Sequence, residues 1–251
     1  MLDHALLLDV GNSRLKWALL KEEKLHAGDA FAYKGQQVDT LFDNHWGELS
    51  GIVTVAVSNV GGAEIAKEIE IWCLDRWGVS SAFIQPVKQS YGVTNSYQSP
   101  LKLGVDRWVC LIGAHAINKA PVCVVDCGTA VTVDVLNKNG EHLGGMITPG
   151  VQLMKSALLN NTSDIAEAGN KSSGFLGKCT ADAVQNGAIH SIAGLIERVV
   201  RELEKEHREI FQLILTGGDA ELIKSHLNCD VRLVSDLALK GLSVIIQDQA
   251  K

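Results

Sequence analysis

Runs of apolar residues in the first half of the chain predict short buried strands and the helices between them. Ala5–Val10 is an almost continuous apolar run with Asp9 near its end, and after a polar turn the apolar residues resume over Leu15–Leu20. This pattern is typical of a strand, a tight turn and a second strand. The other elements expected in this half are a strand over Gly51–Val60, a helix over Ala63–Trp77, a strand over Ser81–Val87 and a helix over Asp106–Ile117.

The second half opens with the same arrangement. The apolar run Val122–Asp126 ends in aspartate, and the turn Gly128–Ala130 leads into a second strand, Val131–Leu136. The clearest helix is Ala188–Lys205, where apolar residues at helical spacing form one stripe. Ser163–Gly177 is polar and contains glycine, which predicts a mobile loop. The remaining expected elements are a strand over Ile210–Leu215 and a final strand and helix within Val231–Ile246.

The two halves repeat one plan. Residues 6–20 (LLLDVGNSRLKWALL) and 123–136 (CVVDCGTAVTVDVL) each consist of a buried strand, an aspartate, a glycine turn with small polar residues, and another strand. Such self-similarity indicates an internal duplication. We therefore expect an α/β fold of two lobes, each a mixed sheet with flanking helices, that face each other across a cleft. The boundary is expected near Asn118–Pro121, which gives lobes of residues 1–118 and 119–251.

Composition and charge narrow the function. The chain has 251 residues, of which 46% are apolar, enough for a packed core. The net charge of -6 argues against a general nucleic-acid binder, which needs a basic face, although a local cluster can still bind a small anion. No apolar run approaches the roughly 18 residues of a membrane span, and the start of the chain lacks the features of a signal peptide. The six cysteines form no C-x-x-C pair, so we expect a reduced, cytoplasmic protein.

The two aspartate–glycine turns are suited to bind phosphate. Glycine lets the backbone turn with no Cβ in the way, so successive N–H groups can face an anion, and Ser13 and Thr129 add hydroxyl donors. Asp9 and Asp126 cannot bind phosphate themselves, but a carboxylate can hold a hydrated Mg²⁺ that does. One Asp-Gly turn alone is more often a plain connection between strands. Two copies with matched flanks, one in each half, favour the ligand site.

A third glycine turn, Thr216–Ala220 (TGGDA), follows a predicted strand and opens a predicted helix. Adjacent glycines let a flat ring or a ribose approach the backbone, which makes this turn the candidate contact for adenosine. Taken alone, the motif also fits a strand-to-helix turn in which Asp219 is a charge at the helix N-terminus.

Asp106, at the start of a predicted helix, has two interpretations. In one, it is the helix N-cap and Arg107 is a surface charge. In the other, Asp106 accepts a hydroxyl proton during group transfer, while Arg107 neutralises an anionic substrate. Tyr97 lies upstream in the loop Ser96–Pro100 and is placed to wall a small-molecule pocket.

Three other patterns do not indicate a ligand-binding or catalytic site. Gly144–Gly150 (GGMITPG) is expected mainly to reverse the chain. Gly174–Lys178 (GFLGK) lacks the first glycine and the final Ser or Thr of a P-loop, and no G-x-G-x-x-G follows a strand. The eight histidines show no spacing typical of metal ligands.

Together, these motifs resemble the type III pantothenate kinases, which belong to the superfamily of acetate and sugar kinases, Hsp70 and actin. In order along the chain, they are DVGNSRLKW, Y-x6-GVDRW, DCGTAVTVD, GGMITPG and TGGDA. The resemblance extends from Leu6 to about Ala220, and GVDRW combined with DCGTA is its most specific part. It implies an actin-like (ribonuclease H-like) fold in both lobes. It also implies ATP-dependent phosphorylation of pantothenate to 4'-phosphopantothenate, the first step of coenzyme A synthesis.

The resemblance further implies roles for individual residues. Asp9–Lys16 matches the first phosphate motif, where ATP and Mg²⁺ are bound, and Thr129 matches an ATP contact. Asp106 matches the proton acceptor for the pantothenate hydroxyl, and Asp126 matches the residue that binds a monovalent cation, K⁺ or NH₄⁺. The ATP-binding positions of the first motif are Asp9, Val10, Gly11, Asn12, Ser13, Arg14, Leu15 and Lys16. The pantothenate-binding positions are Tyr97, Gly104, Val105, Asp106, Arg107 and Thr180.

The resemblance also implies a homodimer, with the site completed near the subunit interface. The apolar stripe of Ala188–Lys205 fits such an interface and fits core packing equally well. Lys16 is the only lysine close to a phosphate turn, which agrees with a cation requirement. Two alternatives stay open: a superfamily kinase for another small hydroxy compound, and an accessory factor for transcription that acts without turnover. Three carboxylates around one anion site argue against the second, because each disfavours the anion unless cations are present.

Overall fold

The computed structural model describes residues 4–161 and 174–249, which form two compact units. Unit 1 comprises the described residues within Met1–Lys119, Asn139–His142 and Asp236–Lys251. Unit 2 comprises those within Ala120–Lys138 and Leu143–Ser235. Most of the predicted loop Ser163–Gly177 lies outside the described residues.

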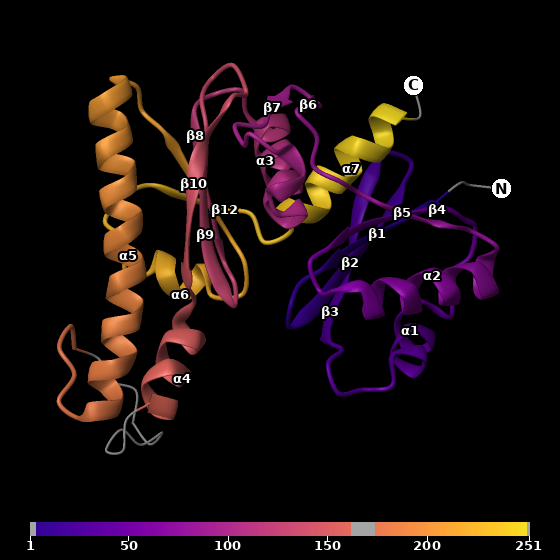
Figure 1. Cartoon of the computed structure of the whole chain (residues 1–251), viewed down its shortest axis with the longest axis horizontal. Coiled ribbons are helices and arrows are strands. Elements are labelled where there is room, and N and C mark those ends of the chain that lie inside the picture. The colour runs from indigo at the N-terminus through magenta and orange to yellow at the C-terminus, as the bar shows by residue number, and fades with distance from the viewer. Residues whose placement is uncertain (1–3, 162–173, 250–251) are drawn as a thin grey trace. The chain divides into compact units, whose positions relative to one another are not determined.

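Unit 1 contains a five-stranded mixed sheet and four helices (Figure 1). In spatial order, the strands are β3 (Lys24–Ala32), β2 (Arg14–Lys21), β1 (His4–Val10), β4 (Ile52–Asn59) and β5 (Ser81–Phe83). Strand β1 runs antiparallel to β2 and parallel to β4. The helices are α1 (Val38–Trp46), α2 (Ala63–Trp77), α3 (Val105–Ile117) and α7 (Leu237–Gln249). A small hairpin, β6 (Gln89–Ser90) and β7 (Val93–Thr94), precedes a 3₁₀ turn at Pro100–Lys102.

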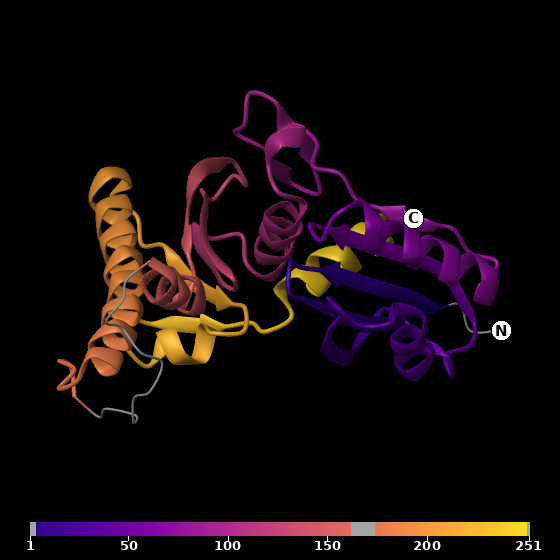
Figure 2. The same cartoon turned by 60° about the horizontal axis from the view of Figure 1, so that its bottom comes forward.

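Strand β1 is apolar at nearly every position, so it needs cover on both faces of the unit 1 sheet. Alternate residues of β1 point to opposite faces, so Leu6 and Leu8 share one face while Leu7 lies on the other. Leu6 and Leu8 belong to a core cluster that includes Phe42 of α1 and Ile69 of α2. Leu7 is equally buried, and α7 packs against β1. Figure 2 shows α2 and α7 against the strands of this unit.

The C-terminal helix α7 belongs to unit 1, so the units differ from the expected lobes 1–118 and 119–251. Two glycines let α7 pack closely on α3. A Cβ on Gly241 would collide with the carbonyl oxygen of Val109, and a Cβ on Gly113 would lie 2.6 Å from the carbonyl oxygen of Leu237. The apolar face of a helix does not predict from sequence which sheet the helix packs against. Here, the close packing of α7 on α3 places α7 in unit 1.

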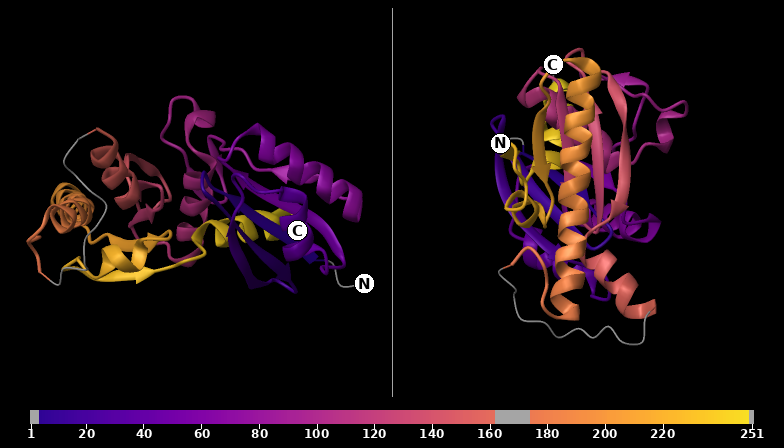
Figure 3. Two further views of the ribbon diagram at one scale, coloured as in Figure 1. Left: turned by 90° about the horizontal axis from the view of Figure 1, so that it is seen from below. Right: turned by 90° about the vertical axis from the view of Figure 1, so that its left-hand side faces the viewer.

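Unit 2 repeats the same sheet. In spatial order, its strands are β10 (His142–Pro149), β9 (Ala130–Leu136), β8 (Val122–Cys127), β11 (Gln212–Thr216) and β12 (Val231–Leu233). Strand β8 is antiparallel to β9 and parallel to β11, as β1 is to β2 and β4. The helices are α4 (Val151–Asn161), α5 (Thr180–His207) and α6 (Ala220–Lys224), with α4 beside α5 (Figure 3). This repetition confirms the predicted α/β fold with two duplicated mixed sheets.

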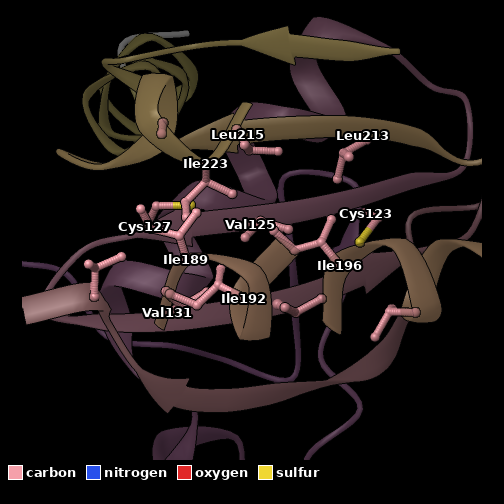
Figure 4. Close-up of a cluster of buried hydrophobic side chains, with 14 of the residues drawn as sticks. Cys123, Val125, Cys127, Val131, Ile189, Ile192, Ile196, Leu213, Leu215 and Ile223 are labelled. Carbon is pink, nitrogen blue, oxygen red and sulfur yellow. The ribbon is translucent and has the colours of Figure 1, made fainter. Parts of the chain in front are cut away.

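The apolar stripe of α5 packs into the core of unit 2 (Figure 4). Ile189, Ile192 and Ile196 are all buried in one cluster with residues of β8 and β11. The strand residues of that cluster include Cys123, Val125, Cys127, Leu213 and Leu215. Core packing therefore accounts for the stripe, and the alternative that it forms a subunit interface is wrong.

The local pattern does not predict β3, α1, β10 or α4. Strands β3 and β10 are edge strands with many exposed residues, so they lack the alternation that marks a half-buried strand. The expectation that Gly144–Gly150 mainly reverses the chain is wrong, because residues 144–149 belong to β10. Glycine and proline are tolerated in an edge strand. Helix α5 begins at Thr180, whereas the prediction began at Ala188. The first turns of the helix were missed because they are polar and carry no apolar stripe.

All six cysteines are free, and Cys73, Cys110, Cys123 and Cys127 are buried. Within residues 4–161 and 174–249, no helix combines the length and the apolar character needed to cross a membrane.

Candidate active site

The first aspartate–glycine turn joins β1 to β2. Asp9 lies in register with Lys16 on β2 and with Ser58 on β4. The Gly11 N–H donates to the carbonyl oxygen of Arg14 at 3.0 Å and closes the turn. The side chains of Asn12 and Ser13 in this turn are exposed.

Some residues of the predicted ATP motif have side chains that cannot reach a ligand. Val10 and Leu15 are fully buried in the core of unit 1, so only their main chain can meet a ligand. The Arg14 guanidinium donates to the carbonyl oxygen of Ala30 at 2.8 Å and ties the turn to β3. The groups of this motif that stay candidates for binding phosphate are the turn backbone, the Ser13 hydroxyl and Lys16.

The surroundings of Asp9 fit a hydrated Mg²⁺. Ser58 is fully buried, and its Oγ has no hydrogen-bond partner among the residues that the structure describes. A buried hydroxyl of this kind is commonly satisfied by an ordered water or an ion. Carboxylate and water oxygens are the ligands that Mg²⁺ prefers, usually with one or two carboxylates and several waters. Asp9 is a carboxylate of the kind that holds a hydrated Mg²⁺, and Ser58 lies in register beside it on β4.

The second aspartate–glycine turn joins β8 to β9 in unit 2. The Gly128 N–H donates to the carbonyl oxygen of Ala130 at 3.1 Å and closes a turn one residue shorter than the first. Thr129 is exposed at the tip. Asp126 is partly buried and lies in register with Thr132 on β9 and Thr216 on β11.

The TGGDA turn lies directly against Asp126. Gly217 has a φ of +92°, and a Cβ there would collide with the Asp126 carboxylate. The Asp219 N–H donates to the carbonyl oxygen of Cys127 at 2.9 Å. Close packing of turn against turn therefore requires glycine at this position.

Asp219 joins Asp126 in this part of unit 2, which the sequence pattern had not predicted. Asp219 is the N-cap residue of α6, but its side chain makes no capping hydrogen bond, and burial raises the pKa of its carboxyl. Burial, followed by the charges of Asp126 and Asp219, raises the pKa of the Cys127 thiol to about 12. The thiol therefore stays protonated, and the charges of both aspartates act on it.

Asp106 and Arg107 begin α3 in unit 1. The N-cap of α3 is Gly104, so the interpretation of Asp106 as N-cap is wrong. Asp106 lies in the first turn, where its Oδ1 accepts a hydrogen bond from the Arg107 N–H at 2.8 Å. A Cβ on Gly104 would come within 2.5 Å of the same oxygen, which explains the glycine before Val105. Asp106 is partly exposed.

The interpretation of Arg107 as a surface charge is also wrong. Only 6% of Arg107 is exposed, and its Nη1 donates to the Tyr97 hydroxyl at 2.9 Å. The guanidinium carbon lies 5.7 Å from the centroid of the Tyr97 ring. A guanidinium held at low exposure binds a carboxylate through charge-assisted hydrogen bonds, the strongest kind available to a small anionic substrate.

The loop that carries Tyr97 is organised by residues that no local motif reveals. Asn95 is fully buried. Its Oδ1 accepts from the Tyr97 N–H at 3.0 Å, and its Nδ2 donates to the carbonyl oxygen of Pro100 at 3.2 Å. His142 stacks on the Tyr97 ring at a centroid distance of 6.1 Å and pairs with Ser96 through Nδ1 at 3.0 Å. These contacts place the Tyr97 hydroxyl next to Arg107.

Thr180, the remaining predicted substrate contact, is the first residue of α5 and is exposed. It belongs to unit 2, whereas Tyr97, Asp106 and Arg107 belong to unit 1. Among the described residues, no group of three or more His, Cys, Asp or Glu side chains has the arrangement of a metal site.

Comparison with known sequences finds close relatives of one kind. A family model described as type III pantothenate kinase matches residues 5–202. A type III pantothenate kinase of Aromatoleum aromaticum is 38% identical over 245 residues, which cover 98% of each chain. A type III pantothenate kinase of Nitrosococcus oceani is 34% identical over 252 residues, which cover 98% of this chain and 95% of the relative.

Comparison with solved structures confirms the predicted actin-like fold. A protein described as a Baf family transcriptional activator from Campylobacter jejuni aligns with a TM-score of 0.62 at 22% identity, over 98% of each chain. The activator of 2-hydroxyisocaproyl-CoA dehydratase from Clostridium difficile, solved with bound ADPNP, aligns with a TM-score of 0.55 at 14% identity, over 98% of this chain and 95% of that one. At these identities, the likeness concerns the fold alone.

Proposed function

The chain belongs to the type III pantothenate kinase family, and we propose that Asp106 is the proton acceptor with which it phosphorylates pantothenate. The kinase transfers the γ-phosphoryl group of ATP to the pantothenate hydroxyl and yields 4'-phosphopantothenate and ADP, a step of coenzyme A synthesis. The observation that carries the site assignment is the start of α3. There, the Asp106 carboxylate accepts a hydrogen bond from the Arg107 main-chain N–H, and the buried Arg107 guanidinium donates to the Tyr97 hydroxyl.

This arrangement matches the two needs of the substrate. Pantothenate is a carboxylate with a hydroxyl to be phosphorylated. Arg107 and the Tyr97 hydroxyl bind the substrate carboxylate, and Gly104 and Val105 line the same helix start. The hydroxyl oxygen forms the new bond to phosphorus, the bond from phosphorus to the ADP oxygen breaks, and the hydroxyl proton passes to the Asp106 carboxylate. Thr180 is assigned to pantothenate by the family resemblance.

The aspartate–glycine turns hold the nucleotide. The turn over Asp9–Lys16 donates N–H groups, the Ser13 hydroxyl and the Lys16 ammonium to the phosphates. Thr129 is assigned to ATP by the family resemblance. Asp9, with Ser58 beside it, would hold Mg²⁺, and a bound Mg²⁺ would supply positive charge to the phosphates.

Asp126 binds a monovalent cation, K⁺ or NH₄⁺. The support is the packing of Asp126 against Gly217 and the presence of a second carboxylate, Asp219, beside Cys127. Two carboxylates in one place repel an anionic nucleotide unless a cation accompanies them. The cation then supplies the positive charge that a P-loop lysine supplies in other kinases.

The function is tested by measuring ADP release and 4'-phosphopantothenate formation with ATP and Mg²⁺, in K⁺, in NH₄⁺ and in Na⁺ alone. Pantothenate-dependent turnover that requires K⁺ or NH₄⁺ is expected. Turnover of equal rate in Na⁺ would remove the cation role of Asp126 and leave the kinase intact. Folded protein that binds MgATP but leaves pantothenate unphosphorylated would contradict the proposed function and favour a ligand sensor or another hydroxy substrate.

We further propose that the enzyme is a cytoplasmic homodimer. Free thiols at all six cysteines support a reducing compartment. Edge strand β10 and helix α4 expose apolar side chains that a second copy would cover, namely Leu143, Met146, Ile147, Leu153 and Leu158. Sedimentation equilibrium is expected to give twice the mass of the chain, and Ile147→Glu is expected to shift it toward the monomer. A monomer at micromolar concentration would contradict this proposal.

A further inference from the structure

Tyr33 makes a hydrogen bond to the first phosphate turn that the sequence does not suggest. Tyr33 directly follows β3, and its hydroxyl donates to the carbonyl oxygen of Gly11 at 2.8 Å. The side chain is 5% exposed, and burial raises the pKa of the phenol, so the hydroxyl remains a donor at neutral pH. A buried side chain that follows β3 therefore binds the Gly11 carbonyl of this turn.

Unit 2 has a similar contact, made by a different chemical group and at the residue after the turn glycine. Gly150 directly follows β10, the strand that occupies the place of β3 in the second sheet. Its N–H donates to the carbonyl oxygen of Thr129 at 2.9 Å, in the second turn. A Cβ on Gly150 would lie 2.8 Å from that oxygen, so the main chain itself must come close. Both turns are thus held at a carbonyl by the residue after the third strand, once through a side chain and once through the backbone.

A third element fixes the Tyr33 hydroxyl. Gly61 follows β4, and a Cβ there would collide with the Tyr33 hydroxyl oxygen and lie 3.2 Å from the Gly11 carbonyl oxygen. The Val60 N–H donates to the carbonyl oxygen of Val10 at 2.9 Å, immediately before the turn. The hydroxyl therefore has little freedom to leave the Gly11 carbonyl.

We propose that Tyr33 is a positioning residue for the ATP phosphates, acting through the peptide plane of Gly11. This inference rests on the proposed function of the turn. Glycine lets a peptide plane rotate at little steric cost. A carbonyl that rotated toward the phosphates would present its negative end to them and remove a favourable arrangement of N–H donors. The hydrogen bond from Tyr33 holds that carbonyl away, so the turn is organised before ATP binds.

The test compares MgATP affinity of the full-length wild-type and Tyr33→Phe proteins by titration calorimetry without pantothenate. Loss of one hydrogen bond to a buried carbonyl predicts a Kd for MgATP that is roughly 3- to 10-fold higher. The KM for pantothenate is expected to stay unchanged, because the hydrogen bond that is lost joins Tyr33 to Gly11 and involves neither Tyr97 nor Arg107. The matched control is Asp43→Ala, which removes the 3.1 Å hydrogen bond from Trp72 elsewhere in unit 1 and should leave the Kd for MgATP unchanged.

A second variant keeps the test open if Tyr33→Phe unfolds. Gly61→Ala displaces the Tyr33 hydroxyl without removing it, and it should also weaken MgATP binding. In the Tyr33→Phe background, the same substitution should have a smaller effect on MgATP affinity, because the colliding oxygen is gone.

The possible results separate the role of Tyr33 from the proposed function. A Tyr33→Phe protein that binds MgATP as tightly as wild type would overturn the inference, as would an equal loss of affinity in Asp43→Ala. Wild-type protein that binds MgATP without phosphorylating pantothenate would overturn the proposed function alone, since the comparison of MgATP affinities still decides the role of Tyr33. Wild-type protein that binds no MgATP would overturn both.

Discussion

Replacing Asp106 by asparagine separates its proposed chemical role from its structural one. In the folded protein, the Oδ1 of Asp106 accepts the Arg107 N–H at 2.8 Å in the first turn of α3. Asparagine retains an acceptor oxygen of the same shape, so this hydrogen bond survives the substitution. What disappears is the negative charge, and with it the ability to accept a proton.

The two roles differ greatly in magnitude. A carboxylate in the first turn of a helix stabilises that helix by about 0.3–1 kcal/mol through the helix dipole. For a chain of this length, that amounts to a fall in Tm of no more than about 4 °C. A general base contributes about 10²- to 10⁴-fold to the rate, which is roughly 2.7–5.5 kcal/mol of activation free energy. Asp106→Asn is therefore expected to lose almost all turnover and almost no stability.

The assay measures kcat, the KM for pantothenate, the Kd for MgATP and the Tm for wild type, Asp106→Asn and Asp106→Ala. Asp106→Asn should lower kcat by at least about 100-fold while the Kd for MgATP stays within twofold. Asp106→Ala should lose a similar factor in kcat and also lose Tm, because it removes the acceptor for the Arg107 N–H. A kcat in Asp106→Asn within a few fold of wild type would refute the reasoning and leave Asp106 a helix-start residue only.

Two further predictions concern stability. Burial raises the pKa of Asp219 above its ordinary 3.8, so the folded state binds this proton more tightly than the unfolded chain, and stability falls as pH rises from about 3.8 through the raised pKa. Asp219→Asn should therefore raise Tm at pH 7, with a gain that shrinks toward pH 3; a gain independent of pH in thermal melts would contradict this. Gly241→Ala should lower stability by about 1–3 kcal/mol, because its Cβ meets the Val109 backbone. Its control, Gly194→Ala, has open space around the new Cβ and should be neutral or stabilising.

Much of the fold follows from local pattern. Helix α2 has the predicted bounds, and β1, β2, β8 and β9 differ from prediction by only a residue or two, because long apolar runs and helical stripes report burial directly. The repeated Asp-x-Gly turn also revealed the duplication that the two equivalent sheets confirm. Prediction failed at β3 and β10, where edge exposure removes the periodic signal.

The candidate site divides in the same way. Asp9, Asp106, Asp126 and the glycine turns stand out in the sequence because each adjoins a strand end or a helix start. Asn95, His142 and Tyr33 do not stand out, since nothing in their neighbours marks them. Their significance comes from partners that are distant in sequence, such as His142 against Tyr97 and Tyr33 against Gly11.

The sequence by itself therefore determined which segments form elements, that the plan occurs twice, and which acidic and glycine residues lie at the ends of strands. Those properties depend on neighbours within a few positions, whose spacing sets helix or strand and whose side chains set the turn. Only the tertiary structure decided that α7 packs on α3 in unit 1, that Arg107 is buried against Tyr97, and that Tyr33 holds the Gly11 carbonyl. These contacts join segments far apart in the chain, and burial of the whole unit, not local periodicity, selects them.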